Sequence, residues 1–334
     1  MALHPGMADL AGAHAASSSR ARSPRVYPVD ACPACGARGF ESFDLGAGNL
    51  LQRCTACATV SAREYADPAD IYVDGYLFGQ VGNFGVDVRN PLFQRYLMRV
   101  AHRRMEIIEL ATGSSGRTLL DVGCGSGEVL LAASERGWQT QGVEPERTGA
   151  EMAQARGLDV RIASLEDSGL PERSYDVVSA FHVLEHIPDG RPFLELLMRW
   201  ARPGGHIVIE VPNWRSVQRR RLREHWSGLR PLEHIVHHTP QTLDRLMRSV
   251  GIVPVVLRSP SYLGPPQRLE HALNDLVRHG RYRRMLELLS SRQAPDGEPA
   301  VYPTRAGWAV LRATEAIYDR AGVGAVVLAV GAVP

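Results

Sequence analysis

The chain has 334 residues, an apolar fraction of 44% and a charged fraction of 22%, which is ordinary for a globular protein. Its formal net charge of +2 gives no strong field that would point to nucleic acid or an anionic membrane. Residues 1–25 lack the continuous apolar core of a signal peptide, and the most apolar run, 323–333, has about half the length of a membrane span. We therefore expect a disordered tail over 1–25 and a cytoplasmic location.

Four of the five cysteines form two pairs, Cys32-Pro-Ala-Cys35 and Cys54-Thr-Ala-Cys57. Two knuckles of this spacing can complete a tetrahedral zinc site, and four thiolates leave no open position for chemistry. The alternatives are disulfides, which a cytosolic chain would keep reduced, and a redox centre, which needs only one pair. The spacing thus predicts a structural zinc ribbon over residues 26–63.

Residues 64–114 read as a helical connector or lid. Aromatic side chains gather in its first part: Tyr65, Tyr72, Tyr76, Phe78 and Phe84. Residues 91–110 then carry apolar residues at helical spacing. We expect the aromatics to pack between the ribbon and the next domain rather than to touch a substrate.

A glycine-rich turn follows the short apolar strand that ends at Asp121-Val122. Gly123, Gly125 and Gly127 occupy alternate positions of the turn, and a helix begins after it. Glycine permits positive φ and close approach of a ligand, and the helix N-terminus offers free N–H groups. The pattern differs from the G-x-G-x-x-G of pyrophosphate-binding dehydrogenases. The preceding acid would repel a pyrophosphate but suits a ligand that carries an ammonium and a sulfonium.

A second strand ends in an acid at Gly142-Val-Glu144, where an α/β fold places a carboxylate for ribose hydroxyls. Two further strands are expected over 175–180 and 206–211. The first of them leads into Phe181-His-Val-Leu-Glu-His-Ile187, and the turn Arg202-Pro-Gly-Gly205 precedes the second.

As a set, these motifs over residues 115–258 resemble the class I S-adenosylmethionine (SAM) dependent methyltransferases. The cysteine pairs and Tyr-rich connector further resemble bacterial members with an N-terminal zinc ribbon, some of which act on nucleotide-linked sugars or other secondary metabolites. The resemblance implies a Rossmann-like α/β sheet with helices on both faces and a product, S-adenosylhomocysteine (SAH). It implies cofactor contacts from residues that follow the first four strands: Asp121, Gly123, Gly125, Gly127, Glu144, Ser164, Leu165, Phe181 and His182.

His182 is the first candidate for a catalytic base, because it follows the strand at the edge where open α/β sheets bind ligands. Apolar Phe181 beside it leads us to expect a neutral imidazole that could take a proton. His234, in the stretch Pro231-Leu-Glu-His234, is the second candidate. The array His182-x-x-Glu185-His186 leaves three interpretations open: an inverted zinc-peptidase motif, a divalent metal site on these three residues, or, as we prefer, a structural helix start.

The rest of the chain completes the expected core. Thr239-Pro240 should cap a helix that Gly251 ends, with His237 and His238 packing at its entry. Residues 259–310 read as an insertion that caps the substrate site, and 311–334 as the last helix and an antiparallel strand. We therefore expect methyl transfer to oxygen or carbon of a small molecule. The alternatives are an RNA methyltransferase, to which arginines at 219–223 could contribute, and a non-catalytic SAM-binding protein.

Overall fold

The computed structural model describes residues 24–46, 48, 50–71, 88–89, 91–113, 117–262, 290–291, 302–303 and 305–334. Several predictions lie outside these residues. They concern most of the tail over 1–25, the aromatics Tyr72, Tyr76, Phe78 and Phe84, and most of the insertion over 259–310.

Seven strands form the central sheet: β6 (Thr118–Val122), β7 (Gln139–Val143), β8 (Val160–Arg161), β9 (Tyr175–Phe181), β10 (Ala201–Pro212), β12 (Val253–Arg258) and β15 (Val326–Ala332). Their order is β12-β15-β10-β9-β6-β7-β8. The five strands β8, β7, β6, β9 and β10 run parallel to one another, whereas β15 is antiparallel to both β10 and β12. The chain adds β7 and β8 on one side of β6 and then returns to add β9 on the other side. Ligands are therefore expected at the carboxyl ends of β6 and β9.

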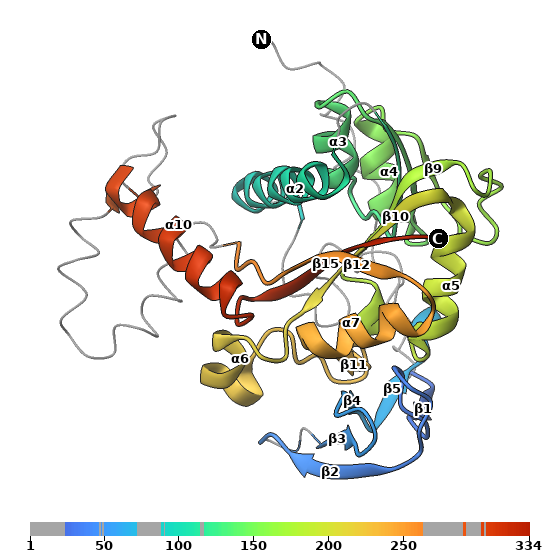
Figure 1. Cartoon of the computed structure of the whole chain (residues 1–334), viewed down its shortest axis with the longest axis vertical. Helices are drawn as coiled ribbons and strands as arrows, with labels where there is room; N and C mark the ends of the chain where they lie inside the picture. The colour runs from blue at the N-terminus through green and yellow to red at the C-terminus, as the bar shows by residue number, and fades with distance from the viewer. Residues whose placement is uncertain are drawn as a thin grey trace, which may run out of the picture.

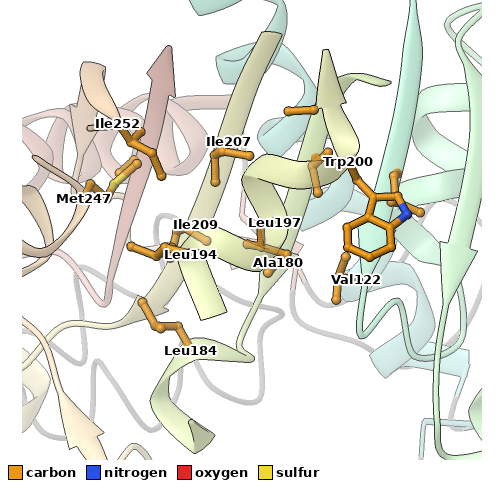
Figure 2. Close-up of a cluster of buried hydrophobic side chains, with 14 of the residues drawn as sticks. Val122, Ala180, Leu184, Leu194, Leu197, Trp200, Ile207, Ile209, Met247 and Ile252 are labelled. Atoms are coloured by element: carbon orange, nitrogen blue, oxygen red, sulfur yellow. The ribbon is translucent and has the colours of Figure 1, made fainter. Parts of the chain in front are cut away.

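Helices cover both faces of this sheet (Figure 1). One hydrophobic cluster joins the sheet to α5 (Gly190–Trp200) and α7 (Pro240–Ser249). A second joins it to α2 (Pro91–Thr112), α3 (Glu128–Ser134) and α4 (Arg147–Ala155). Neighbouring strand residues alternate between the two clusters, as Leu120 and Leu119 do, because successive side chains of a strand point to opposite faces. Figure 2 shows the first cluster, with Leu194, Leu197 and Trp200 of α5 against Ile207 and Ile209 of β10.

The predicted helix over 239–250 is confirmed in detail. Thr239 is the N-cap of α7 and exchanges hydrogen bonds with Thr242 in a capping box, which satisfies N–H groups that the first turn leaves open. The chain leaves the helix through Gly251 at φ +88°. The predicted turn Arg202–Gly205 lies within β10, whose pairing with β9 shifts register between Ala201 and His206.

The N-terminal module is built from two small sheets. β1 (Val26–Pro28) pairs with β5 (Glu64–Ala66). The other sheet has the order β11-β4-β3-β2, formed by β2 (Phe40–Asp44), β3 (Leu50–Cys54), β4 (Val60–Ala62) and β11 (Val236–His237). β11 lies far along the chain, directly before α7 (Figure 1). The module therefore extends beyond the predicted boundary at residue 63, and its larger sheet includes β11, a strand from the segment after β10.

Shorter elements complete the described chain: α1 (Pro68–Ile71), η2 (Leu184–His186), α6 (Val217–Leu222), η3 (Arg223–His225), β13 (Ser290–Ser291), β14 (Tyr302–Pro303) and α10 (Arg305–Arg320). Among the described residues, no helix combines the length and apolarity that crossing a membrane requires.

Candidate functional site

The glycine-rich turn between β6 and α3 adopts the conformation that its sequence predicts. Gly123, Gly125 and Gly127 have φ of +72°, +53° and +84°. A Cβ on Gly123 would lie 2.6 Å from Val183, and one on Gly127 would lie 2.5 Å from Leu158. A Cβ on Gly125 would meet no described atom within 4 Å. The first and third glycines are thus required by packing, and Gly125 faces open space.

Two buried carboxyl groups border this turn. Asp121 is 3% exposed at the end of β6, and the hydroxyl of Ser179 donates to it at 2.7 Å. Burial raises the pKa of Asp121 to about 7, against the lowering effect of that hydrogen bond. Glu144 follows β7 and accepts from the backbone N–H groups of Gly125 and Glu146, each at 2.8 Å. Burial raises the pKa of Glu144 as well.

The residues predicted to border an adenine have different surroundings. The hydroxyl of Ser164 donates to Asp167 at 2.7 Å on the exposed side of the chain after β8. Leu165 is buried in the cluster that includes Val122 and Val143. Both follow β8 at the same sheet edge as Glu144.

A charged network lies at the carboxyl ends of β9 and β10. Glu210 of β10 is fully buried and binds the guanidinium of Arg104 from α2. It also accepts from the hydroxyl of Tyr262 at 2.6 Å. His182 bridges two carboxylates, with Nδ1 at 3.1 Å from Glu185 and Nε2 at 3.3 Å from Glu210. Its side chain is 43% exposed, so it is the member of the network that a ligand can reach.

The expectation of a neutral imidazole at His182 is wrong for this structure. Burial alone would lower its pKa, but hydrogen bonds and charges from Glu185 and Glu210 raise the pKa to about 9. On Glu210, burial would raise the pKa, but Arg104 and His182 lower it to about 2. The apolar neighbour Phe181 suggested low polarity, whereas the decisive groups are Glu185, three residues further along the same segment, and Glu210 of β10. The ring of Phe181 lies 4.4 Å from the guanidinium of Arg104.

Backbone strain marks the same network. His182 has φ +57° and Tyr262 has φ +44°, a left-handed conformation that costs non-glycine residues energy and is enriched at functional sites. Sequence reasoning missed Arg104, Glu210 and Tyr262. Of these three, only Glu210 could have been found in the sequence, because its carboxylate interrupts the otherwise apolar run Ile207-Val-Ile-Glu-Val211.

Glu185 and His186 lie in the one-turn helix η2, in agreement with the preferred interpretation of a structural helix start, and the described residues do not form the alternative metal cluster of His182, Glu185 and His186. His182 turns toward Glu210, and the side chains whose ligand atoms lie within 4.8 Å of one another are Glu185, His186 and His234. A zinc-peptidase arrangement is also excluded for this segment, because His182 follows a strand and the other two residues form the one-turn helix η2. His234 is 6% exposed, and burial lowers its pKa well below the usual value.

The two other histidines pack as predicted at the entry of α7. The His237 ring lies 5.1 Å from the Trp214 ring, and His238 contacts Thr242. The predicted basic run lies on α6 and η3, where Arg219 packs 4.3 Å above Trp214. Arg219 is thus held against the protein and does not lie on an open basic face.

The four paired cysteines converge in the N-terminal module. The Sγ atoms of Cys32 and Cys57 are 3.5 Å apart, and those of Cys35 and Cys54 are 3.6 Å apart. All four are free thiols whose sulfurs lie within 4.8 Å of one another. Tetrahedral Zn–S bonds of about 2.3 Å require sulfurs close to this spacing, so the cluster fits a zinc ribbon.

Comparison with known proteins agrees with the sheet and the glycine turn. Residues 93–255 match the family model described as "Methyltransferase domain". A ubiquinone biosynthesis O-methyltransferase of Idiomarina loihiensis is 30% identical over 157 residues, which is 44% of this chain and 61% of the relative. A protein of the same name from Cupriavidus pinatubonensis is 24% identical over 178 residues, 48% and 69% of the two chains. The present chain spans less than two thirds of the length of the first relative.

Two solved structures are also similar. A possible histamine N-methyltransferase from Thermotoga maritima is 18% identical and covers 72% of this chain and 93% of that one, with a TM-score of 0.41. The plantazolicin methyltransferase BpumL, in complex with SAH, is 15% identical and covers 74% and 86%, with a TM-score of 0.44.

Residues 93–255 thus match a methyltransferase domain, and the sheet to which they contribute six strands, with its antiparallel β15, agrees with the predicted Rossmann-like fold of class I. The chain joins this domain to a front module whose four-cysteine cluster is consistent with a zinc ribbon.

Proposed function

We propose that the chain transfers a methyl group from SAM to a small-molecule acceptor. The observation that carries the proposal is the convergence of four features at the carboxyl edge of the sheet. These are the left-handed glycine turn, the buried carboxyl groups of Asp121 and Glu144, and the exposed His182. Asp121 lies at the end of β6 and the glycine turn follows that strand, whereas Glu144 follows β7 and His182 follows β9. Open α/β sheets bind their ligands at this edge.

The residues fit the cofactor. Open space beside Gly125 admits a ligand against the backbone, and Asp121 would lie near the amino group of the methionine part. Glu144 would accept from the ribose hydroxyls, exchanging its present bonds to backbone N–H groups. Bound SAM supplies a methyl group that its sulfonium already activates. The protein must then align the acceptor with that group and exclude water.

His182 is proposed to contact the acceptor. Nδ1 of its imidazole is held by Glu185, and Nε2 would exchange its 3.3 Å contact with Glu210 for a charge-assisted hydrogen bond to a hydroxyl of the acceptor. This orienting role replaces the predicted proton removal: the methyl group would pass from the sulfonium to the acceptor oxygen, SAM would leave as SAH, and the hydroxyl proton would be released to solvent. We assign the acceptor to hydroxyl-bearing small molecules, such as a secondary metabolite or nucleotide-linked sugar. The relatives are O-methyltransferases by name, which favours oxygen over carbon.

The front module is proposed to hold one structural zinc ion through Cys32, Cys35, Cys54 and Cys57. Their thiols are close enough for tetrahedral coordination and are not joined as disulfides. Free thiols at such short range fit a reducing compartment, and we propose the cytoplasm.

Calorimetry with SAM and SAH tests the cofactor assignment, and thermal denaturation with SAH plus a panel of hydroxyl-bearing metabolites tests the acceptor class. We expect binding of both cofactors and a further rise in melting temperature with the right acceptor, because a ligand that binds only the folded state stabilises it. No measurable binding of SAM or SAH by the folded chain would refute the proposed function.

A further inference from the structure

A cleft lies at the carboxyl ends of β10 and β12, beside the start of β15. Because β15 is antiparallel to both strands, these ends lie at the same edge of the sheet as the glycine turn. Three arginines from separate segments line the cleft: Arg215 follows β10, Arg258 ends β12 and Arg320 ends α10. Its volume is about 190 Å³, whereas about 10–15 Å³ is enough for a single water molecule. The cleft therefore admits a small ligand.

The lining of this cleft carries an excess of positive charge. Its one carboxylate, Asp319, pairs with Arg258 at 3.0 Å and also accepts from the backbone N–H of Ser259. Within the part of the chain that the structure describes, neither Arg215 nor Arg320 forms an ion pair. Charges of one sign in a cleft focus their field and raise the local concentration of counter-ions. Two guanidinium groups are thus available to an anionic ligand.

The backbone that carries the arginines is fixed by a buried junction. Asn213 is fully buried, and its side-chain amide donates to the hydroxyl of Ser259 at 2.8 Å and to the carbonyl of Gly324 at 2.9 Å. Its Oδ1 accepts from the backbone N–H of Arg215 at 2.9 Å. A Cβ on Gly324 would lie 1.7 Å from the carbonyl oxygen of Ser259, so these two segments pack backbone against backbone. A ligand would therefore meet a lining whose backbone is already ordered, which lowers the cost of binding.

Two further features of the lining suit a small molecule with an anionic end. Pro240 and Gln241 form the first turn of α7 and border the cleft, so the positive end of the helix dipole adds to the charge of the arginines. Leu257 of β12 gives the cleft an apolar wall and is 39% exposed. The cleft thus combines positive charge with an apolar surface that the body of a ligand can cover.

We propose that this cleft binds the phosphate group of a small-molecule ligand through Arg215 and Arg320, with Arg258 held beside them by Asp319. The planar fork of a guanidinium group matches the oxygens of a phosphate in a bidentate manner. A phosphate offers three strong acceptor oxygens and a carboxylate only two, so a cluster of three arginines favours phosphate. A phosphorylated methyl acceptor belongs to this class of ligand, but the assignment rests on the cleft alone and does not depend on the proposed methyl transfer.

The test is titration calorimetry of the full chain with inorganic phosphate and with uridine diphosphate (UDP), at saturating SAH so that the cofactor site is filled. We expect one saturable site in the wild type. Arg215→Gln and Arg320→Gln should each weaken binding by at least about tenfold, the lower end of the effect of one charge-assisted hydrogen bond. Arg220→Gln is the matched control, because Arg220 is an exposed arginine of α6 that does not line the cleft; its affinity should equal that of the wild type. If Arg215→Gln fails to fold by thermal denaturation, Arg320→Gln decides, since Arg320 is exposed.

The two probes distinguish the sources of the phosphate. Equal affinity for both probes would assign the cleft to a free phosphate or a phosphomonoester, and tighter binding of UDP would assign it to a nucleotide-linked ligand. No saturable binding of either probe by the wild type, or an equal loss of affinity in Arg220→Gln, would overturn the proposal. A chain that bound no SAH but lost UDP binding in Arg215→Gln would refute the proposed function and retain this site.

Discussion

The front module and the methyltransferase core are stabilised by different means. The core buries two large apolar clusters on the two faces of a seven-stranded sheet. Among the described residues, the buried apolar set around the cysteines contains Cys32, Cys54, Cys57 and Ala34, with Ala37 and Phe40 packed against it. So small an apolar core gives little stability by burial. The core can thus fold by hydrophobic burial. The front module has a second apolar cluster, in which Leu51 and Val60 pack with Trp214 and Trp226, and we expect its cysteine end to need the proposed metal ion.

The two regions are nevertheless not independent bodies. β11 pairs with β4, and the backbone N–H of Gly190 at the start of α5 donates to the carbonyl of Pro33 at 2.9 Å. The side chain of Arg245 on α7 donates to the carbonyl of Cys57 at 2.7 Å. The module is thus docked on helices that also pack against the sheet, and mutations in either region measure how far this docking couples them.

The largest expected effect is loss of the front module in Cys32→Ser. Structural zinc contributes about 10–16 kcal/mol of apparent binding free energy in zinc-finger peptides, so the variant should lose one zinc equivalent and its β2–β3 amides should exchange rapidly. SAM affinity should change little, because the glycine turn belongs to the core. Elemental analysis and hydrogen exchange measure these results, with Cys124→Ser as a control for zinc content. A variant with full zinc content would contradict the four-thiolate assignment.

The next effect concerns the core alone. Glu144→Ala should weaken binding of SAM and SAH by about tenfold to a hundredfold, since a hydrogen bond to a charged group contributes about 1.5–3 kcal/mol. Zinc content should not change. Calorimetry measures the affinity, and Glu151→Ala on the exposed side of α4, where it pairs with Arg147, is the matched control. Equal affinity in Glu144→Ala and wild type would mean that this strand end does not hold the ribose.

A smaller effect is expected at the acceptor side of the core. His182→Ala should lower the methyl-transfer rate at saturating SAM by at least about tenfold, the lower end of the effect of one charge-assisted hydrogen bond, and leave SAM affinity nearly unchanged. Single-turnover kinetics and calorimetry separate the two. The control is His102→Ala, an exposed histidine of α2 beside Glu135. If His182→Ala instead lost SAM binding and kept its turnover, the residue would belong to the methionine pocket.

The smallest expected effect tests how strongly the front module and the core are coupled. Thr239→Ala removes the N-cap of α7 and should destabilise the chain by about 1 kcal/mol, measured by chemical denaturation. Because α7 follows β11 and carries Arg245, the variant should also speed amide exchange in β4. Gln241→Ala, exposed one residue into the same helix, should do neither. If amide exchange became faster only in the core and not in β4, the destabilisation of α7 would not reach the front module.

The amino-acid sequence alone determined the parts whose partners are near in the chain or whose pattern repeats. The glycine turn, the acid after β7, the cap at Thr239 and the cysteine knuckles each depend on local backbone conformation or on fixed short spacing. The sheet with helices on both faces was predicted from the resemblance that these motifs carry as a set, and the structure and the family match support it.

Only the tertiary structure decided the electrostatics of the site. His182 meets Glu210 of the next strand, and Glu210 meets Arg104, which lies 106 residues earlier in the chain. The same packing lets Glu185 contact His182 and also lie close to His186 and His234. Protonation and ligand geometry depend on charges within a few ångströms. Such distances arise when strands and helices pack, so the local pattern around His182 contained Glu185 but could not reveal Glu210 or Arg104.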